Sequence, residues 1–433
     1  MTKLKRELGL LETTLAGIGI IVGVGIYVLI GGAASLTGNS IWLSFAVGAV
    51  IAILTGLSYA ELSSLFPKAG AETVYTEKTF GRTWAFAIGW MIILGGSFSA
   101  ATVTLGFASY FNDFFGTNML LVAIGAVIVF SFINFWGIKE SARLAIAFTL
   151  IEILGLIIII AIGLPYLGKV DYLEMPNGVE GMLQATVLVF FAYLGFEAIT
   201  RLSEETKDAE KTIPKAIVIS IAVSSVLYIL VALCAVSIVD WHKLAGSQAP
   251  LALVARTAFG ANAYAILTFI ALFAAANTAL LMLVTDSRII YGMACSGLFP
   301  KALSAVHPER KTPIAAILVS MILALAAIFI GDITLVANIT NFTVFITFIT
   351  MNLAVIWLRY DWPHAKRGFK VPLNIGKFPV LPIFGAFTCV FMITTFPIEI
   401  IVGGFATILL GLAIYILAGK GWARQHKERR IRR

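Results

Sequence analysis

Four glycines fall within nine residues of the stretch 17-GIGIIVGVGIY-27, which lies in the first long apolar run of the chain. One seam of small residues, along which membrane helices approach closely, is the simplest explanation of such a run. Gly23 and Gly25 do not fit it, because residues two apart point to nearly opposite faces of a helix. Glycine tolerates non-helical backbone and lets a ligand come close. The stretch therefore predicts an interrupted helix, and interrupted backbone at membrane depth implies a binding site near the midplane.

The composition around this stretch is that of a membrane protein. Of the 433 residues, 60% are hydrophobic and 12% are charged, whereas a soluble domain has about 25% charged residues. A bilayer core about 30 Å thick needs roughly 20 apolar residues in a helix. The first run is too long for a cleaved signal peptide. Twelve runs of suitable length predict an all-α polytopic protein, with spans at 11–34, 40–66, 83–111, 119–137, 141–163, 181–202, 213–239, 256–286, 313–331, 336–358, 379–397 and 398–419.

The basic residues are distributed very unevenly over the predicted loops. Of the 31 Lys and Arg, 28 fall on one side of the membrane, and Lys169, Lys243 and Arg256 fall on the other. The positive-inside rule then predicts that both termini are cytoplasmic, in a protein of the cell membrane. The net charge of +8 is thus no sign of nucleic-acid binding, and the basic tail 420–433 is expected near anionic lipid, with partner binding as an alternative. The three cysteines stand at no metal-ligand spacing and are interpreted as small buried hydrophobic residues.

A second candidate interruption occurs in the sixth span, at 190-FFAYLGFE-197, where a glycine and an ionisable residue lie deep in an apolar run. It lies five spans after the first, as expected for two five-helix repeats of inverted topology. We therefore predict a single membrane domain over 1–433, with repeats at 11–163 and 181–358 and two further helices within 379–419.

The motif 59-YAELSSLFPKAG-70 at the end of span two, with the glycine-rich first helix, resembles the amino acid–polyamine–organocation (APC) transporter superfamily. Further stretches agree in the same order: 195-GFE-197, 296-SGLFP-300, 369-FKVP-372 and 379-PVLP-382. The chain looks most like prokaryotic amino acid permeases and the cationic amino acid transporter branch. The resemblance implies the leucine-transporter fold of five plus five helices with two more appended.

The resemblance also implies where an amino acid binds. By similarity, its carboxylate meets the N–H groups of Gly23, Val24 and Gly25. Its ammonium meets the carbonyls of Ile21, Phe191 and Leu194, within a second interruption that also contains Ala192 and Gly195. Phe191 takes the position of an aromatic residue that closes over the substrate, and Met282 that of a pocket-lining residue.

Charged residues cost at least about 2.5 kcal/mol at a helix centre, so each is a functional candidate. Glu152 lies in the middle of span five, where several proton-coupled relatives have a Lys. We expect it either to carry a proton or to bind sodium together with Asn277; the structural alternative is a hydrogen bond to Asn277 or Thr278. Glu197 is a second coupling candidate, with a structural bond to unwound backbone as its alternative.

The predicted function is secondary active amino acid transport by alternating access, most simply as proton symport. Exchange of amino acids or polyamines, sodium coupling, and a channel or substrate sensor on the same scaffold are the alternatives. Polyamines would need several carboxylates, and only Glu197 is expected near the site, so the aliphatic lining favours neutral amino acids. Catalytic motifs and a P-loop are absent from the sequence, so neither an enzyme nor a cofactor is predicted. A disulfide-linked heavy chain is not expected, because the loop 111–118 has no cysteine.

Overall fold

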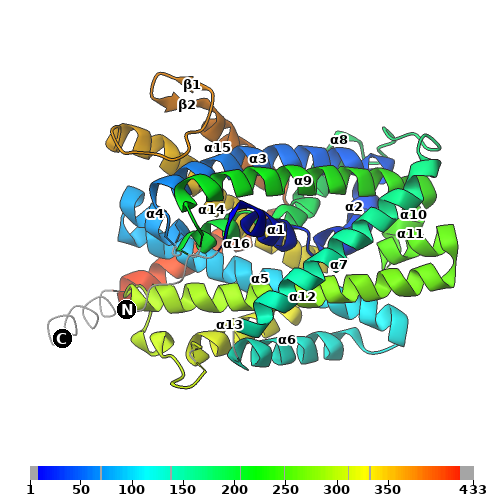
Figure 1. Cartoon of the computed structure of the whole chain (residues 1–433), viewed down its shortest axis with the longest axis horizontal. Coiled ribbons are helices and arrows are strands. Elements are labelled where there is room, and N and C mark those ends of the chain that lie inside the picture. The colour runs from blue at the N-terminus through cyan, green and yellow to red at the C-terminus, as the bar shows by residue number, and fades with distance from the viewer. Residues whose placement is uncertain are drawn as a thin grey trace.

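The computed structural model of this protein describes residues 8–68, 71–136, 139–204, 206–247, 249–310, 312–330 and 333–419. These residues form a bundle of long helices, from which a small antiparallel hairpin projects (Figure 1). The helices of its first half are α1 (Leu10–Ile21), α2 (Val24–Thr37), α3 (Ile41–Leu65), α4 (Ala71–Phe80), α5 (Arg82–Phe115), α6 (Met119–Trp136), α7 (Lys139–Gly163) and α8 (Gly178–Val189). Those of its second half are α9 (Ala209–Ile238), α10 (Trp241–Ala245), α11 (Pro250–Phe259), α12 (Ala261–Cys295), α13 (Ile314–Ile328), α14 (Ile333–Asp361), α15 (Val380–Thr394) and α16 (Ile398–Ile414).

The remaining elements are short. The 3-10 segments are η1 (Gly38–Ser40), η2 (Leu164–Tyr166), η3 (Phe190–Tyr193), η4 (Glu197–Glu204) and η5 (Lys301–Ser304), and a π-helical turn covers Tyr415–Gly419. The hairpin consists of β1 (Asn374–Ile375) and β2 (Phe378–Pro379), with Asn374 opposite Pro379.

All twelve predicted spans correspond to helices of the structure. Nine stretches of the described residues are long and apolar enough to cross a membrane, and the first, Leu10–Leu65, runs through the first two predicted spans. The shorter apolar helices α13 and α15 correspond to predicted spans nine and eleven. The prediction of a multi-pass helical membrane protein is thus confirmed.

Two details of the prediction are wrong. The eighth span does not begin at residue 256, because α11 ends at Phe259, Gly260 adopts a φ of +79°, and α12 starts afresh at Ala261. Cys295 is exposed, since it is the last residue of α12, whereas Cys234 and Cys389 are buried as predicted.

The bundle has a tightly packed interior and an apolar exterior. Helix α3 packs along α9, and α5 packs along α12. The outer helices α6 and α16 instead expose large apolar side chains, such as Phe132 at 55% and Leu409 at 67%. Soluble proteins rarely expose contiguous apolar surface of this kind, whereas lipid tails solvate it.

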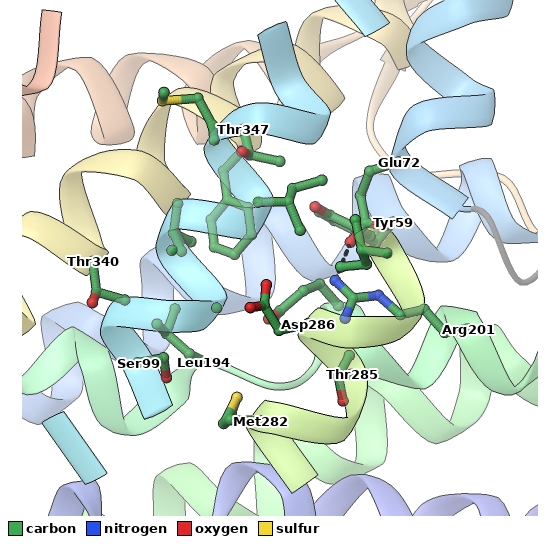
Figure 2. Close-up of a pocket in the computed structure, with 18 residues that line it drawn as sticks. Tyr59, Glu72, Ser99, Leu194, Arg201, Met282, Thr285, Asp286, Thr340 and Thr347 are labelled. Atoms are coloured by element: carbon green, nitrogen blue, oxygen red, sulfur yellow. Dashed lines mark hydrogen bonds and ion pairs between the residues drawn. The ribbon is translucent and has the colours of Figure 1, made fainter. Parts of the chain in front are cut away.

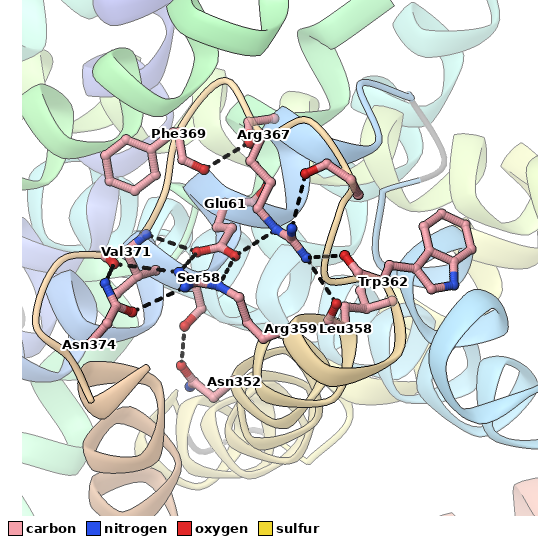
Figure 3. Close-up of polar contacts among 12 residues, drawn as sticks. Ser58, Glu61, Asn352, Leu358, Arg359, Trp362, Arg367, Phe369, Val371 and Asn374 are labelled. Carbon is pink, nitrogen blue, oxygen red and sulfur yellow. Dashed lines mark hydrogen bonds and ion pairs between the residues drawn. The ribbon is translucent and has the colours of Figure 1, made fainter. Parts of the chain in front are cut away.

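A buried ion-pair cluster joins the end of α3 to the end of α14 and to the segment that follows it (Figure 3). Glu61 accepts two hydrogen bonds of 2.5 Å from the guanidinium of Arg359, and a third of 2.8 Å from the N–H of Val371. Arg367 lies 3.1 Å from the same carboxylate. The side chains of Glu61, Arg359 and Arg367 are only 2%, 3% and 7% exposed. The carboxylate on α3 therefore neutralises buried cations from α14 and from the segment that follows it, both of which are far from α3 in the sequence.

Substitution Glu61→Gln tests this cluster. It keeps the side-chain volume but leaves two buried guanidinium groups without a counter-charge, which costs about 3–5 kcal/mol. We expect the Tm of the detergent-solubilised protein to fall by several degrees. Asp240→Asn is the matched control, because Asp240 and its partner His242 are 58% and 69% exposed, and such a pair contributes about 0–1 kcal/mol. Equal Tm values for the two variants would contradict a structural role for Glu61.

Candidate functional site

The first and sixth membrane segments are both interrupted, as the sequence predicts. Helix α1 ends at Ile21, Gly23 is extended, and α2 starts at Val24. In the sixth segment, η3 follows α8, and Leu194 is extended. Gly195 then adopts a φ of +120°, and a Cβ there would lie 3.0 Å from the carbonyl oxygen of Ile20. Glycine is thus required by both conformation and close approach.

The two interruptions pack directly against each other. A Cβ on Gly25 would lie 2.7 Å from the Cα of Ala192. The hydroxyl of Tyr228, on α9, lies 2.7 Å from the carbonyl oxygen of Ile21 and 2.9 Å from that of Ala192. One phenol hydroxyl therefore hydrogen-bonds to carbonyl groups of both interrupted segments.

Some of the backbone groups that are predicted to bind the substrate are already hydrogen-bonded within the protein in this conformation. The carbonyl of Ile21 also accepts from the N–H of Gly23 at 2.7 Å, and the carbonyl of Phe191 accepts from that of Leu194 at 3.2 Å. The N–H groups of Val24 and Gly25 begin α2, where a first turn has no intrahelical acceptors. Of the three predicted donors, the N–H of Gly23 is thus used within the protein in this conformation, and those of Val24 and Gly25 stand at the start of α2.

A cavity of about 60 Å³ lies beside the second interruption. Side chains from α3, α4, α5, η4, α12 and α14 form its wall (Figure 2). Of the predicted site residues, Leu194, Glu197 and Met282 line it, and the side chain of Phe191 lies in the hydrophobic core. Since one buried water needs about 10–15 Å³ of such space, the cavity has room for about four to six water-sized groups.

Charged side chains line this cavity in greater number than the sequence predicts. Arg201 on η4 forms an ion pair of 3.0 Å with Glu72 on α4. Glu197 accepts a hydrogen bond of 2.9 Å from the N–H of Gly195, and Asp286 is a third lining carboxylate. The expectation that only Glu197 lies near the site is therefore wrong. Asp286 could have been found from the sequence, because it follows Met282 by four residues on the same helix face, whereas Glu72 lies in a segment predicted as a loop.

Comparisons with known proteins agree with this architecture. A family model described as amino acid permease matches residues 8–418. The chain belongs to the amino acid permease family. It is 33% identical to the branched-chain amino acid permease BcaP of Bacillus subtilis (strain 168), over 98% of this chain and 94% of that protein. It is 30% identical to the methylthioribose transporter of the same organism with the same coverage. With cationic amino acid transporter 4 of Homo sapiens, the identity is 30% over 85% of this chain and 62% of that protein.

The amino acid permease is accordingly a multi-pass membrane transporter of amino acids, and not an enzyme. The twelve-helix leucine-transporter-like fold of its family accounts for the two interruptions, since they fall in the first and sixth membrane segments.

Glu152 of the permease lies behind the first interruption, outside the cavity lining. Its side chain is fully buried, and Oε1 accepts a hydrogen bond of 3.2 Å from the amide of Asn277. Oε2 has no hydrogen-bond partner in the described part of the chain. The hydroxyl of Tyr27, on α2, donates to the backbone carbonyl of Glu152 at 2.7 Å. The structure therefore brings Glu152 and Asn277 together, next to the start of α2.

Substitution Gly25→Ala tests the contact between the interruptions. Helix propensity alone favours alanine by about 1 kcal/mol, but the new methyl group would lie 2.7 Å from the Cα of Ala192. Overpacking of this kind costs about 1–3 kcal/mol, so we expect a lower Tm and loss of amino acid uptake. Gly403→Ala on α16 is the control, since no atom lies within 4 Å of its Cβ position. A Gly25→Ala variant as stable and active as the control would refute the close contact.

Proposed function

We propose that this permease is a proton-coupled amino acid symporter of the cell membrane that works by alternating access about its two interrupted segments. The proposal rests on one juxtaposition: a buried carboxyl group, Glu152, with an unpartnered oxygen lies next to interrupted backbone that carries donors and acceptors. The proposal includes both termini in the cytoplasm, which the 28 to 3 distribution of basic residues supports.

An amino acid zwitterion matches the polarity of the interrupted backbone. The N-terminus of α2 presents N–H groups and the positive end of a helix dipole, which suit the carboxylate. The carbonyls of Ile21, Phe191 and Leu194 suit the ammonium. To reach them, the substrate displaces the hydroxyl of Tyr228 and separates Gly25 from Ala192. Substrate binding therefore competes with the contacts that hold the two interruptions together. This competition links substrate binding to the movement of the two interrupted segments relative to each other.

The coupling role of Glu152 follows from its surroundings. An isolated carboxylate is very unfavourable in an apolar interior unless a proton or a cation neutralises it. Asn277 supplies one hydrogen bond but no charge, and no ion pair to Glu152 occurs among the described residues. A proton taken up at Oε2 neutralises the group without further ligands. Sodium would need several oxygen ligands, so we take the proton as the coupling ion.

Substitution Glu152→Gln separates coupling from binding. Glutamine keeps the hydrogen-bonding partner of Asn277 but cannot release a proton. In proteoliposomes we expect uptake driven by an imposed pH gradient to fall at least tenfold, while exchange of labelled for unlabelled amino acid continues.

Glu180→Gln, at an exposed position of α8, is the matched control and should leave gradient-driven uptake intact. Unchanged proton dependence in Glu152→Gln would reject the role of Glu152. Uptake driven by a sodium gradient and indifferent to pH would reject proton symport, and a leak that does not saturate with substrate would reject the carrier mechanism.

A further inference from the structure

The hairpin of β1 and β2 carries large apolar side chains that the described part of the chain leaves uncovered. Leu373, which directly precedes β1, is 67% exposed, and Ile375 within β1 is 75% exposed. Leu373 also adopts a φ of +57°, a left-handed conformation that residues other than glycine rarely adopt. A bulky apolar residue that is both strained and exposed points to a function outside the packing of the bundle.

The hairpin is attached firmly to the bundle from which it projects (Figure 1). The guanidinium of Arg359 donates a hydrogen bond of 3.1 Å to the side chain of Asn374, whose amide group donates one of 2.9 Å to the carbonyl of Val371. Asn374 thus turns toward the ion-pair cluster of Glu61. Successive side chains of a strand point to opposite faces, so Ile375 points away from the bundle.

The neighbouring helices place the hairpin near the boundary between membrane and water. Helix α14 ends shortly before it, and its last turns expose Trp357 and Tyr360. Trp and Tyr are enriched at the two interfaces of a membrane. Helix α15 begins directly after β2 and exposes Phe384 and Phe387, as a lipid-facing helix does. The hairpin therefore lies between an interfacial aromatic group and a lipid-facing surface, at the level of the lipid headgroups.

The segment that contains the hairpin is strongly basic. Residues 362–379 include four Lys or Arg and no Asp or Glu. Arg367 is paired with Glu61. The other three are exposed and form no ion pair with a described residue: Lys366, Lys370 and Lys377. Exposed lysines beside a membrane attract anionic headgroups.

The surroundings of the hairpin favour lipid over a protein partner. The acidic neighbours are Asp361 at the end of α14 and Glu210 at the start of α9, which lies close to Gly368 and is followed by Lys211. A second copy of the chain would bring two basic hairpins together, which like charges oppose. Strands of two residues offer only a short edge for pairing with another protein. A leaflet with anionic phospholipid suits both the apolar and the basic side chains.

We propose that the hairpin is an interfacial anchor, in which Leu373 and Ile375 insert among the headgroups and exposed lysines bind the phosphates of anionic phospholipids. Apolar burial and attraction to anionic lipid add together in interfacial segments. Arg359 connects the hairpin to Glu61 on α3, so lipid bound there also stabilises the contact between α3 and α14. The proposal goes beyond amino acid transport and depends on neither the substrate nor the coupling ion.

Site-directed spin labelling tests the insertion. Cys295→Ser removes the exposed cysteine, and Ile375→Cys then carries a nitroxide in the full chain, in nanodiscs of phosphatidylcholine and phosphatidylglycerol. We expect collisions with oxygen, which dissolves in lipid, to exceed those with a water-soluble nickel chelate at least threefold. Glu309→Cys, labelled in the exposed loop after η5, is the control and should show the reverse. Preferential collision with nickel at Ile375 would overturn the proposal. So would shielding from both reagents, because protein would then cover the hairpin.

A double variant tests the attraction to anionic lipid. The Tm of the wild type should be several degrees higher in nanodiscs with phosphatidylglycerol than in phosphatidylcholine alone. Lys370→Gln with Lys377→Gln should lose most of this difference, since it removes exposed charge and leaves the apolar side chains in place. Lys169→Gln with Lys243→Gln, at exposed positions outside the hairpin segment, is the matched control and should retain it. An equal lipid dependence in the two double variants would overturn the proposal. Loss of amino acid uptake with the lipid dependence intact would instead concern the proposed function alone.

Discussion

Backbone that leaves a helix inside a membrane must find its hydrogen bonds within the protein, and this constraint organises the permease. The interruption after Ile21 and the one at Leu194 and Gly195 satisfy it by lying against each other. Tyr228 reaches carbonyl groups of both segments, so α9 is fixed beside them. The same polar backbone that requires this packing is what a zwitterionic substrate can use. The proposed substrate site therefore coincides with the backbone that this constraint holds together.

Buried carboxyl groups in this fold differ in how completely their oxygens are hydrogen-bonded. That difference distinguishes a structural carboxylate from one that can take part in a binding site. Glu61 is surrounded by Arg359, Arg367 and the N–H of Val371, so it needs nothing more and joins distant segments. Oδ2 of Asp286 accepts hydrogen bonds from two hydroxyl groups, whereas Oδ1 has no hydrogen-bond partner among the described residues. Burial alone identifies neither class, since both groups are almost inaccessible. What distinguishes them is whether the protein itself completes the bonding.

The sequence predicts the helical segments and both interruptions, because apolar length and closely spaced glycines are local signals. It does not predict contacts between segments far apart in the chain. Glu72 lies on a helix within a predicted loop, and only the fold brings it to Arg201. The same limit explains why a single carboxylate was expected at the cavity. The separate start of α12 was missed because Gly260 interrupts a continuous apolar run with little change in hydropathy.

Helix α12 provides a continuous physical link between the proposed coupling group and the cavity. Near its middle, Asn277 donates to Glu152, and Thr278 lies against Gly23 in the first interruption. Two turns further along, the same helix carries Asp286. A rigid helix transmits small shifts because its backbone bonds are all made internally. The proposed proton site at Glu152 and the cavity thus both contact one helix, which also lies against the interrupted backbone. In the proposed mechanism, coupling therefore requires only a change in how α12 packs against α1 and α2, without a long chain of side-chain rearrangements.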